Sequence, residues 1–241
     1  MPALVIADTA QERKRKTIKG EFSQTLLRHI GETLNRGEQV IIFQNRRGYA
    51  PMVNCEACGW IPKCVNCAVS LTYHQYKNDM VCHYCGYRQV MPPQCPSCAS
   101  TRIKTLGYGT EKIAEELQVY FPDAAIQRMD LDTTRAKHAY ENIIHAFETG
   151  ETKILVGTQM VTKGLDFDNV GLVGVFNADR MMHFPDFRAY ERAYQLIVQV
   201  SGRAGRKEKP GTVVIQTTQA DHAVIAHIRA QNFENFFDSE I

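Results

Sequence analysis

Four Cys-x-x-Cys pairs are the feature that most constrains the fold. All 8 cysteines of the 241-residue chain belong to these pairs, and all lie between Cys55 and Cys98. Each pair places two thiolates on one tight turn, and two such turns close a tetrahedral zinc site. Clustering of this kind favours metal ligation over disulfide bonds or redox chemistry. The sequence therefore predicts two structural Zn²⁺ ions in a small segment, residues 55–98, that has few aliphatic residues.

The spacing of the pairs predicts which cysteines share an ion. Only five residues separate the first pair from the second, too few for both turns to fold back onto one ion. Fourteen residues separate the second pair from the third, which is about the length of a β-hairpin and close to zinc-ribbon spacing. The prediction is a nested arrangement. The inner site takes Cys64, Cys67, Cys82 and Cys85, and the outer site takes Cys55, Cys58, Cys95 and Cys98.

The aromatic residues of this segment admit two interpretations. They are Trp60, Tyr73, Tyr76, Tyr84 and Tyr87. In so small a segment aromatic side chains complete a miniature core, but exposed rings also stack on unpaired bases. His74 and His83 are alternative metal ligands, although eight thiolates already suffice for two ions. The sequence leaves the choice between core and base stacking open.

Outside residues 55–98 the chain alternates between apolar runs of strand length and amphipathic runs of helix length. Strands are expected at 39–44, 125–129, 153–157, 170–176 and 211–217, and residues 1–6 could form a further short strand. Helices are expected at 22–34, 111–120, 134–147, 186–200 and 221–237. Strands separated by helices form a parallel, doubly wound α/β sheet that binds ligands at the carboxyl ends of its strands. The cysteine segment is then an insertion between the first of these strands and the helix that follows it.

The charge and hydropathy of the sequence limit the kinds of partner that the chain can be expected to contact. The chain has 28 Lys and Arg against 26 Asp and Glu, so its net charge is +2. Such a balance does not by itself indicate nucleic-acid binding, and any contact must come from local patches. No apolar run approaches the roughly 18 residues that a membrane span needs, and no signal peptide opens the chain. We expect a soluble, cytoplasmic protein without membrane contact.

Two arginines stand three residues apart in the stretch Gln199-Val-Ser-Gly-Arg-Ala-Gly-Arg206, at the end of a predicted helix. A guanidinium among small residues can reach out of its domain toward a phosphate, whose oxygens match its planar fork of donors. The stretch resembles motif VI of superfamily-2 helicases, the arginine-finger signature. The alternative is a basic helix end followed by a turn.

Residues 154–167 resemble motif V of the same superfamily, in which a strand is followed by Gly-Thr and then by a Lys-Gly-x-Asp turn. A threonine hydroxyl and exposed amides at the end of a strand suit a phosphodiester backbone. The alternative is an ordinary loop of a Rossmann-like sheet. Motif VI at the expected distance downstream favours the helicase interpretation.

Further stretches of the sequence narrow the resemblance from the helicase superfamily to one family. They are 43–51, 107–111, 157–160 and 186–189. With four cysteine pairs inserted after the first of them, the chain resembles the PriA family of DNA helicases, also called primosomal replication protein N′, over residues 20–220. The resemblance implies a RecA-like second helicase lobe with a two-zinc insertion in the same nested pairing. The expected divisions are a linker or end of a preceding lobe (1–20), the start of the lobe (21–54), the insertion (55–98), the remainder of the lobe (99–220), and a C-terminal helix leading to a further domain (221–241).

The resemblance also implies roles for individual residues. Arg206 and Arg203 would be catalytic and approach the phosphates of ATP. Gly164, Asp166 and Gln199 would contact the nucleotide. The residues implied to contact DNA are Thr158, Lys163, Asn45, Arg46 and Arg47. For Arg47, an ion pair within the domain is the alternative.

The chain contains no phosphate-binding loop of the Gly-x-x-x-x-Gly-Lys-Ser/Thr type and no Asp-Glu-x-His motif. The resemblance places these, with Mg²⁺, in a preceding lobe, so this chain alone is expected to be inactive. The full-length protein is expected to be an ATP-dependent 3′ to 5′ DNA helicase that acts at stalled replication forks, in replication restart and primosome assembly.

The resemblance implies branched and single-stranded DNA, the single-stranded-DNA-binding protein and primosome proteins as partners. Two other functions explain part of the sequence. A zinc-ribbon module could dock proteins or DNA without catalysis. A translocase lobe of a restriction or recombination enzyme would account for motifs V and VI, but not for the cysteine pairs.

Overall fold

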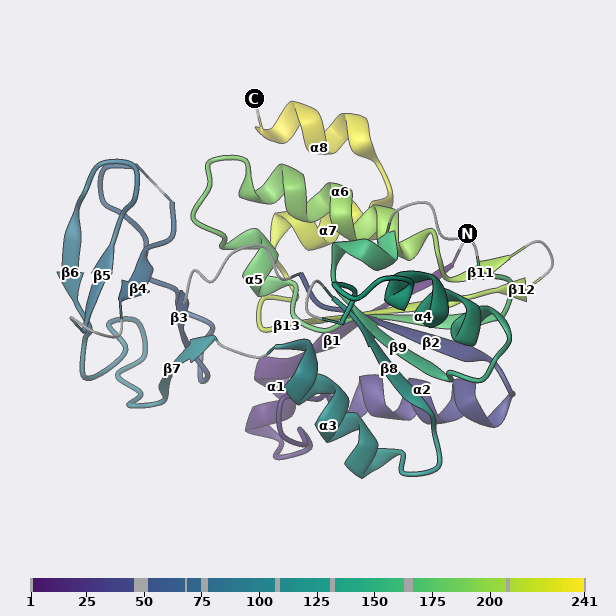
Figure 1. The fold of residues 1–241 in the computed structure, drawn as a ribbon. Helices are drawn as coiled ribbons and strands as arrows, with labels where there is room; N and C mark the ends of the chain where they lie inside the picture. The colour runs from purple at the N-terminus through teal and green to yellow at the C-terminus, as the bar shows by residue number, and fades with distance from the viewer. Residues whose placement is uncertain are drawn as a thin grey trace.

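The computed structural model describes residues 2–45, 52–67, 69–74, 78–106, 109–130, 133–162, 167–206 and 209–240 (Figure 1). Its centre is a six-stranded sheet in which every neighbouring pair is parallel, in the order β1-β13-β10-β2-β9-β8. The strands are β1 (Ala3–Asp8), β2 (Gln39–Phe43), β8 (Ile126–Met129), β9 (Ile154–Gly157), β10 (Val170–Val175) and β13 (Thr212–Thr217). The predicted parallel α/β fold is confirmed.

Helices cover both faces of the sheet (Figure 1). One face carries α2 (Gln24–Asn35) and α3 (Thr110–Tyr120), and the other carries α4 (Ala139–Glu148), α6 (Ala189–Ser201) and α7 (Ala223–Ala230). Alternate residues of β2 serve the two cores, because Val40 and Ile42 pack on the α2 side while Ile41 and Phe43 pack on the α6 side. A strand buried on both faces needs this continuous apolar run.

The other elements of the lobe are short. They are α1 (Thr9–Lys14), the 3₁₀ turn η1 (Gln159–Thr162), α5 (Asp179–Met182), the hairpin strands β11 (Gly205–Arg206) and β12 (Lys209–Pro210), and α8 (Phe233–Glu240). The sequence patterns did not predict α5 or the hairpin. Both are shorter than the windows over which helical or strand periodicity can be recognised.

Residues 1–20 were expected to be a linker or the end of a preceding lobe, with a short strand as an alternative at residues 1–6. Residues 3–8 form the edge strand β1, paired in parallel register with β13, and α1 follows directly. Leu4 and Ile6 pack against one core, and Val5 and Ala7 against the other. A short apolar run is ambiguous along the sequence, because only its pairing in space shows that it belongs to this sheet.

The helix expected over 221–237 is two helices. α7 ends where Gln231 adopts a left-handed φ of 52°, and the Asn232 side chain then accepts a hydrogen bond from the Asn235 amide at 3.0 Å. The turn folds α8 back onto α6, where Phe236 stacks on Tyr194 with ring centroids 4.4 Å apart. Burying this ring favours the break over a continuous helix.

The cysteine segment leaves the sheet on a two-stranded stalk and stands to one side of the lobe (Figure 1). The stalk pairs β3 (Met52–Cys55) antiparallel with β7 (Ile103–Leu106). Beyond it lies a three-stranded antiparallel sheet of β4 (Thr72–His74), β5 (Asp79–Val81) and β6 (Arg88–Val90). A miniature core that includes Val53, Leu71 and Met80 holds the segment together. The insertion thus falls between β2 and α3, where the sequence predicts it.

Candidate functional site

The eight cysteines gather into two clusters of four. The outer cluster holds Cys55, Cys58, Cys95 and Cys98, and the inner cluster holds Cys64, Cys67, Cys82 and Cys85. Within each cluster all the sulfur atoms lie within 4.8 Å of one another. These are the same two sets that the spacing of the pairs predicts. The outer cluster therefore joins the two ends of the insertion, and the inner cluster closes the hairpin between them.

The sulfur separations fit a tetrahedral metal ion. In the outer cluster Sγ of Cys55 lies 3.6 Å from Sγ of Cys98, and in the inner cluster Sγ of Cys64 lies 3.5 Å from Sγ of Cys85. Four sulfurs about 2.3 Å from a central zinc ion stand about 3.8 Å apart, whereas a disulfide bond is about 2.0 Å long. The two four-cysteine clusters fit zinc-ribbon binding.

The turns of both clusters are shaped for metal ligation. Gly59 and Gly86, which follow the second cysteine of their pairs, have φ of 76° and 75°, a region that glycine enters without strain. Their amides donate to the carbonyl of the first cysteine at 2.8 and 2.9 Å. A hydrogen bond from the backbone of Tyr87 lowers the pKa of the Cys85 thiol to about 6, whereas the hydrogen bond with Cys85 raises the pKa of the Cys67 thiol to about 12. The thiolate is the form that binds a metal.

The described residues that directly follow β2 and β9 meet at the carboxyl edge of the sheet. Thr158 follows β9, is buried, and donates from its amide to the carbonyl of Met129 at 3.2 Å. The next side chain, Gln159, donates from Nε2 to Oδ1 of Asn45 at 3.1 Å. The structure thus brings Asn45 and Thr158, two predicted DNA contacts, to one edge of the lobe.

Gln199, Arg203 and Arg206, three of the predicted nucleotide contacts, lie in the last turn of α6 and in the residues that follow it. Gln199 is exposed in the last turn of the helix. Arg203, just beyond the helix, donates from Nη2 to the carbonyl of Thr162 at 2.8 Å, which ties the motif VI stretch to the 3₁₀ turn after β9. The backbone of Arg206 lies in the β11–β12 hairpin, and its side chain lies outside the described structure.

Five other predicted site residues lie outside the described residues. They are Arg46, Arg47, Lys163, Gly164 and Asp166. Their assigned roles remain predictions.

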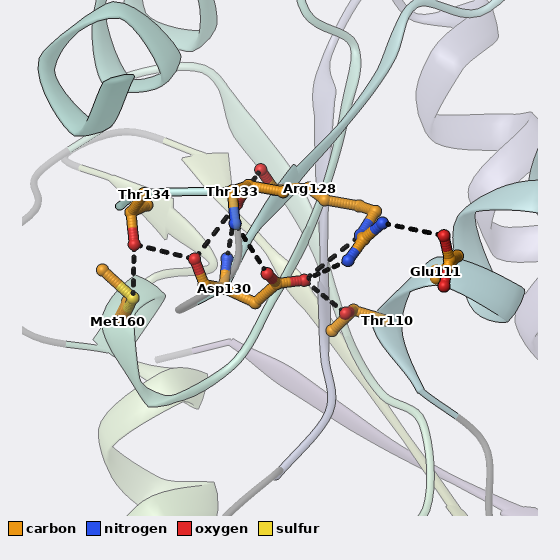
Figure 2. A network of polar contacts seen from close by, with 7 residues as sticks. All are labelled: Thr110, Glu111, Arg128, Asp130, Thr133, Thr134 and Met160. Carbon is orange, nitrogen blue, oxygen red and sulfur yellow. Dashed lines mark hydrogen bonds and ion pairs between the residues drawn. The ribbon is translucent and has the colours of Figure 1, made fainter. Parts of the chain in front are cut away.

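A buried carboxylate beside this edge was missed by the sequence reasoning (Figure 2). Asp130 directly follows β8, and its side chain accepts hydrogen bonds from the Thr110 hydroxyl and from Nε and Nη2 of Arg128 at 3.1 and 3.0 Å. Burial opposes its charge, but these bonds and one from the Thr133 amide outweigh that effect and lower the pKa of Asp130. The network fixes the first residue of α3 to the end of β8. An acidic residue directly after a predicted strand was the available signal.

Comparison with known proteins gives matches along the whole chain. Residues 64–89 match the family model of the PriA DNA helicase Cys-rich region, and residues 98–208 match that of the helicase conserved C-terminal domain. The chain is 45% identical over 241 residues to a replication restart protein PriA of Bacillus subtilis, and 42% identical over 223 residues to that of Haemophilus influenzae. These alignments cover 100% and 92% of this chain and 30% of each relative.

The chain therefore spans about 30% of the length of the curated relatives it matches. A solved structure, the L327V variant of S. cerevisiae Dbp5 bound to RNA and ADP BeF3, is similar with a TM-score of 0.46 at 12% identity, covering 99% of this chain and 40% of that one. A likeness of this size carries no argument about function. Among the described residues, no helix is long and apolar enough to span a bilayer.

Proposed function

Because the chain belongs to the PriA family of replication restart proteins, we propose that it is the second, RecA-like lobe of an ATP-dependent DNA helicase, with its zinc-binding insertion. The observation that carries this proposal is the helicase C-terminal match over residues 98–208, which contains the whole stretch 199–206. The parallel sheet supports the same function, because sheets of this kind bind ligands at the carboxyl ends of their strands.

ATP and Mg²⁺ would bind between this lobe and a preceding lobe that carries the phosphate-binding loop. Arg206 and Arg203 would approach the phosphates and stabilise the charge that develops in phosphoryl transfer. Gly164, Asp166 and Gln199 would complete the nucleotide contacts on this side. The hydrogen bond from Arg203 to the carbonyl of Thr162 supports a link between the nucleotide side and the loop after β9.

A DNA strand would run along the carboxyl edge of the sheet. Thr158 and Lys163 would contact its backbone, as would the loop of Asn45, Arg46 and Arg47. The hydrogen bond between Gln159 and Asn45 supports this assignment, because it joins the residue after Thr158 to Asn45. Closure of the lobes on ATP and their reopening after hydrolysis would shift this edge along the strand in the 3′ to 5′ direction.

Each four-cysteine cluster would hold one structural Zn²⁺, with all eight cysteines as ligands. A site with four protein ligands has no open position, so the zinc would stabilise structure and take no part in hydrolysis. Branched DNA at stalled forks, the single-stranded-DNA-binding protein and primosome proteins would be the partners, in the cytoplasm. The isolated chain, without the preceding lobe, would neither hydrolyse ATP appreciably nor unwind DNA.

Replacing Arg206 in the two-lobed protein tests the assignment. An Arg206→Ala variant should lose DNA-stimulated ATP hydrolysis about a thousandfold or more, as expected for an arginine finger. Its zinc content should stay unchanged. Arg229→Ala, on the exposed face of α7, is the matched control and should keep full activity. Turnover retained by Arg206→Ala would contradict the finger assignment.

The zinc insertion supports a second function, docking of proteins or DNA without catalysis. Its stalk strands pair Cys55 with Ile103, so the ends of the insertion are adjacent and a short glycine linker can replace residues 55–98. If the two-lobed protein without the insertion keeps its ATPase but loses unwinding or assembly, the insertion is a docking element. Loss of the ATPase itself would make the insertion part of the catalytic unit.

A further inference from the structure

The first turn of the outer cluster lies against the lobe. We call residues 55–59 the outer knuckle. At the last residue of this knuckle, the carbonyl of Gly59 accepts a hydrogen bond at 3.3 Å from Nε2 of Gln219, which lies in the turn after β13. A Cβ atom placed on Gly59 would lie 2.8 Å from Oγ1 of Thr218. The knuckle therefore approaches the turn as closely as a residue without a side chain permits.

The lobe side of this contact is held in place by buried groups. The carboxylate of Asp179, in α5, accepts hydrogen bonds from the amide and hydroxyl of Thr218 at 2.8 and 2.7 Å. The Nε2 atoms of Gln219 and His183 lie 2.8 Å apart. Because an amide nitrogen can only donate, His183 must accept, which requires a neutral ring. Burial, with the nearby charge of Lys63, lowers the pKa of His183 to about 4, in agreement with this.

A second contact reaches the knuckle from α1. The carboxylate of Glu56 is nearly buried and receives Nζ of Lys104, on the stalk, at 2.7 Å. Nη1 of Arg13 lies 3.7 Å from the same oxygen, and Arg13 also pairs with Glu21. Arg13 thus connects the knuckle to the lobe through a separate element.

The two contacts share one edge of the sheet. α1 follows β1 and Gln219 follows β13, and these two strands are parallel neighbours, so both contacts come from their carboxyl ends. The stalk by itself is a two-stranded ribbon, which is a weak support in isolation. We propose that the outer knuckle is the anchor that fixes the orientation of the zinc insertion on the lobe, with Gln219 and Arg13 as the positioning residues. This inference does not depend on the helicase function.

Amide hydrogen exchange on the zinc-loaded full chain tests the anchor, because it reports local opening segment by segment. The double variant Arg13→Ala with Gln219→Ala should exchange about tenfold faster over residues 52–62. Exchange over the inner hairpin, 78–90, and over β10 should stay at the wild-type rate. Release of one of the two zinc equivalents to a chromogenic chelator should accelerate, and release of the other should not.

The matched control is the double variant Arg28→Ala with Gln195→Ala, whose side chains pair with Glu32 and Glu191 of their own helices. It should leave exchange over 52–62 unchanged. Gln219→Glu alone keeps the side-chain length but cannot donate to Gly59, so it should give a smaller increase in the same segment. Unchanged exchange over 52–62 in both Gln219 variants would overturn the proposal, as would an equal increase in β10.

Discussion

The outer and inner cysteine clusters have the same ligands and nearly the same sulfur spacing, yet they rest on different supports. The inner cluster closes on a miniature core in which Leu71 and Met80 are fully buried, and on a three-stranded sheet of its own. The outer cluster joins the stalk strand β3 to the turn at Cys95 and contacts the lobe through Glu56 and Gly59. Metal-binding geometry is therefore local in both clusters. Among the described residues, the lobe contacts the outer knuckle through α1 and the turn after β13, and it contacts Lys63, beside Cys64 of the inner cluster, through the Tyr190 hydroxyl at 3.4 Å.

The largest effect should come from removing one ligand of each cluster in turn. Zinc binding in such sites contributes on the order of 10 kcal/mol to folding, so Cys82→Ser should release the inner zinc and unfold residues 69–90. Cys58→Ser should release only the outer zinc and leave the inner hairpin folded. The zinc content of each variant measures the release of zinc, and amide hydrogen exchange measures the local unfolding. Loss of both ions from the Cys58→Ser variant would show that the clusters are not independent.

Substituting two buried leucines tests whether the stability of the insertion is independent of the stability of the lobe. Leu71 lies in the miniature core and Leu117 in the core under α3, and both are fully buried. Truncation to alanine at such sites costs about 2–5 kcal/mol. Leu71→Ala should speed exchange only within the insertion, whereas Leu117→Ala should lower the melting temperature of the lobe. If Leu71→Ala also lowered the melting temperature of the lobe, the insertion and the lobe would not be independently stable.

Acid should weaken the lobe around the outer contact. Burial depresses the pKa of His183 from 6.5 to about 4, so the neutral ring stabilises the fold fully above pH 6.5. That contribution, up to about 3 kcal/mol, should be lost as the pH falls from 6.5 toward 4, because the unfolded chain binds the proton first. The measurement is the free energy of lobe unfolding in wild type and in His183→Gln.

Zinc release in acid affects both proteins equally, so the difference between their pH profiles reports His183. His138→Gln, at an exposed position, should follow the wild-type profile. Identical pH profiles for wild type and His183→Gln would contradict the claim that His183 is buried and neutral where it contacts Gln219.

The smallest predicted effect is the difference between alanine substitutions at two equivalent glycines, Gly59 and Gly86. Gly59 and Gly86 have nearly the same positive φ, and alanine in that region costs about 1–2 kcal/mol at either position. A Cβ at Gly59 would meet Thr218, whereas a Cβ at Gly86 has no neighbour within 4 Å. Gly59→Ala should therefore loosen its knuckle more than Gly86→Ala, by about 1 kcal/mol or more in exchange measurements. Equal effects would mean that the lobe does not restrain the outer knuckle.

Much of the fold could be predicted from the sequence, because its long elements carry their own signals. The apolar run of β2 and the periodicity of α2 both gave correct elements, and the cysteine spacing predicted the two sets of four that the structure brings together. Residues 1–6 offered a short strand, but its place in the main sheet could not be predicted because it depends on pairing with β13, more than 200 residues away.

The candidate site was less accessible to sequence reasoning. The buried Asp130 and the contact of Gln219 with Gly59 arise from segments that are distant along the chain, and no local pattern encodes such contacts. Asn45 and Thr158 were proposed from a resemblance, and their common place at the sheet edge follows from the parallel order of β2 and β9. The position of Arg203 beside Thr162 likewise needed the packing of α6 on the turn after β9.

The central claim is that two separate zinc sites sit on one helicase lobe, and metal content tests it most directly. Atomic emission on the chain, purified without added zinc, should give two zinc ions per wild-type molecule. It should give one in Cys58→Ser and one in Cys85→Ser. One zinc or none in well-folded wild-type protein would contradict the nested arrangement of the eight cysteines.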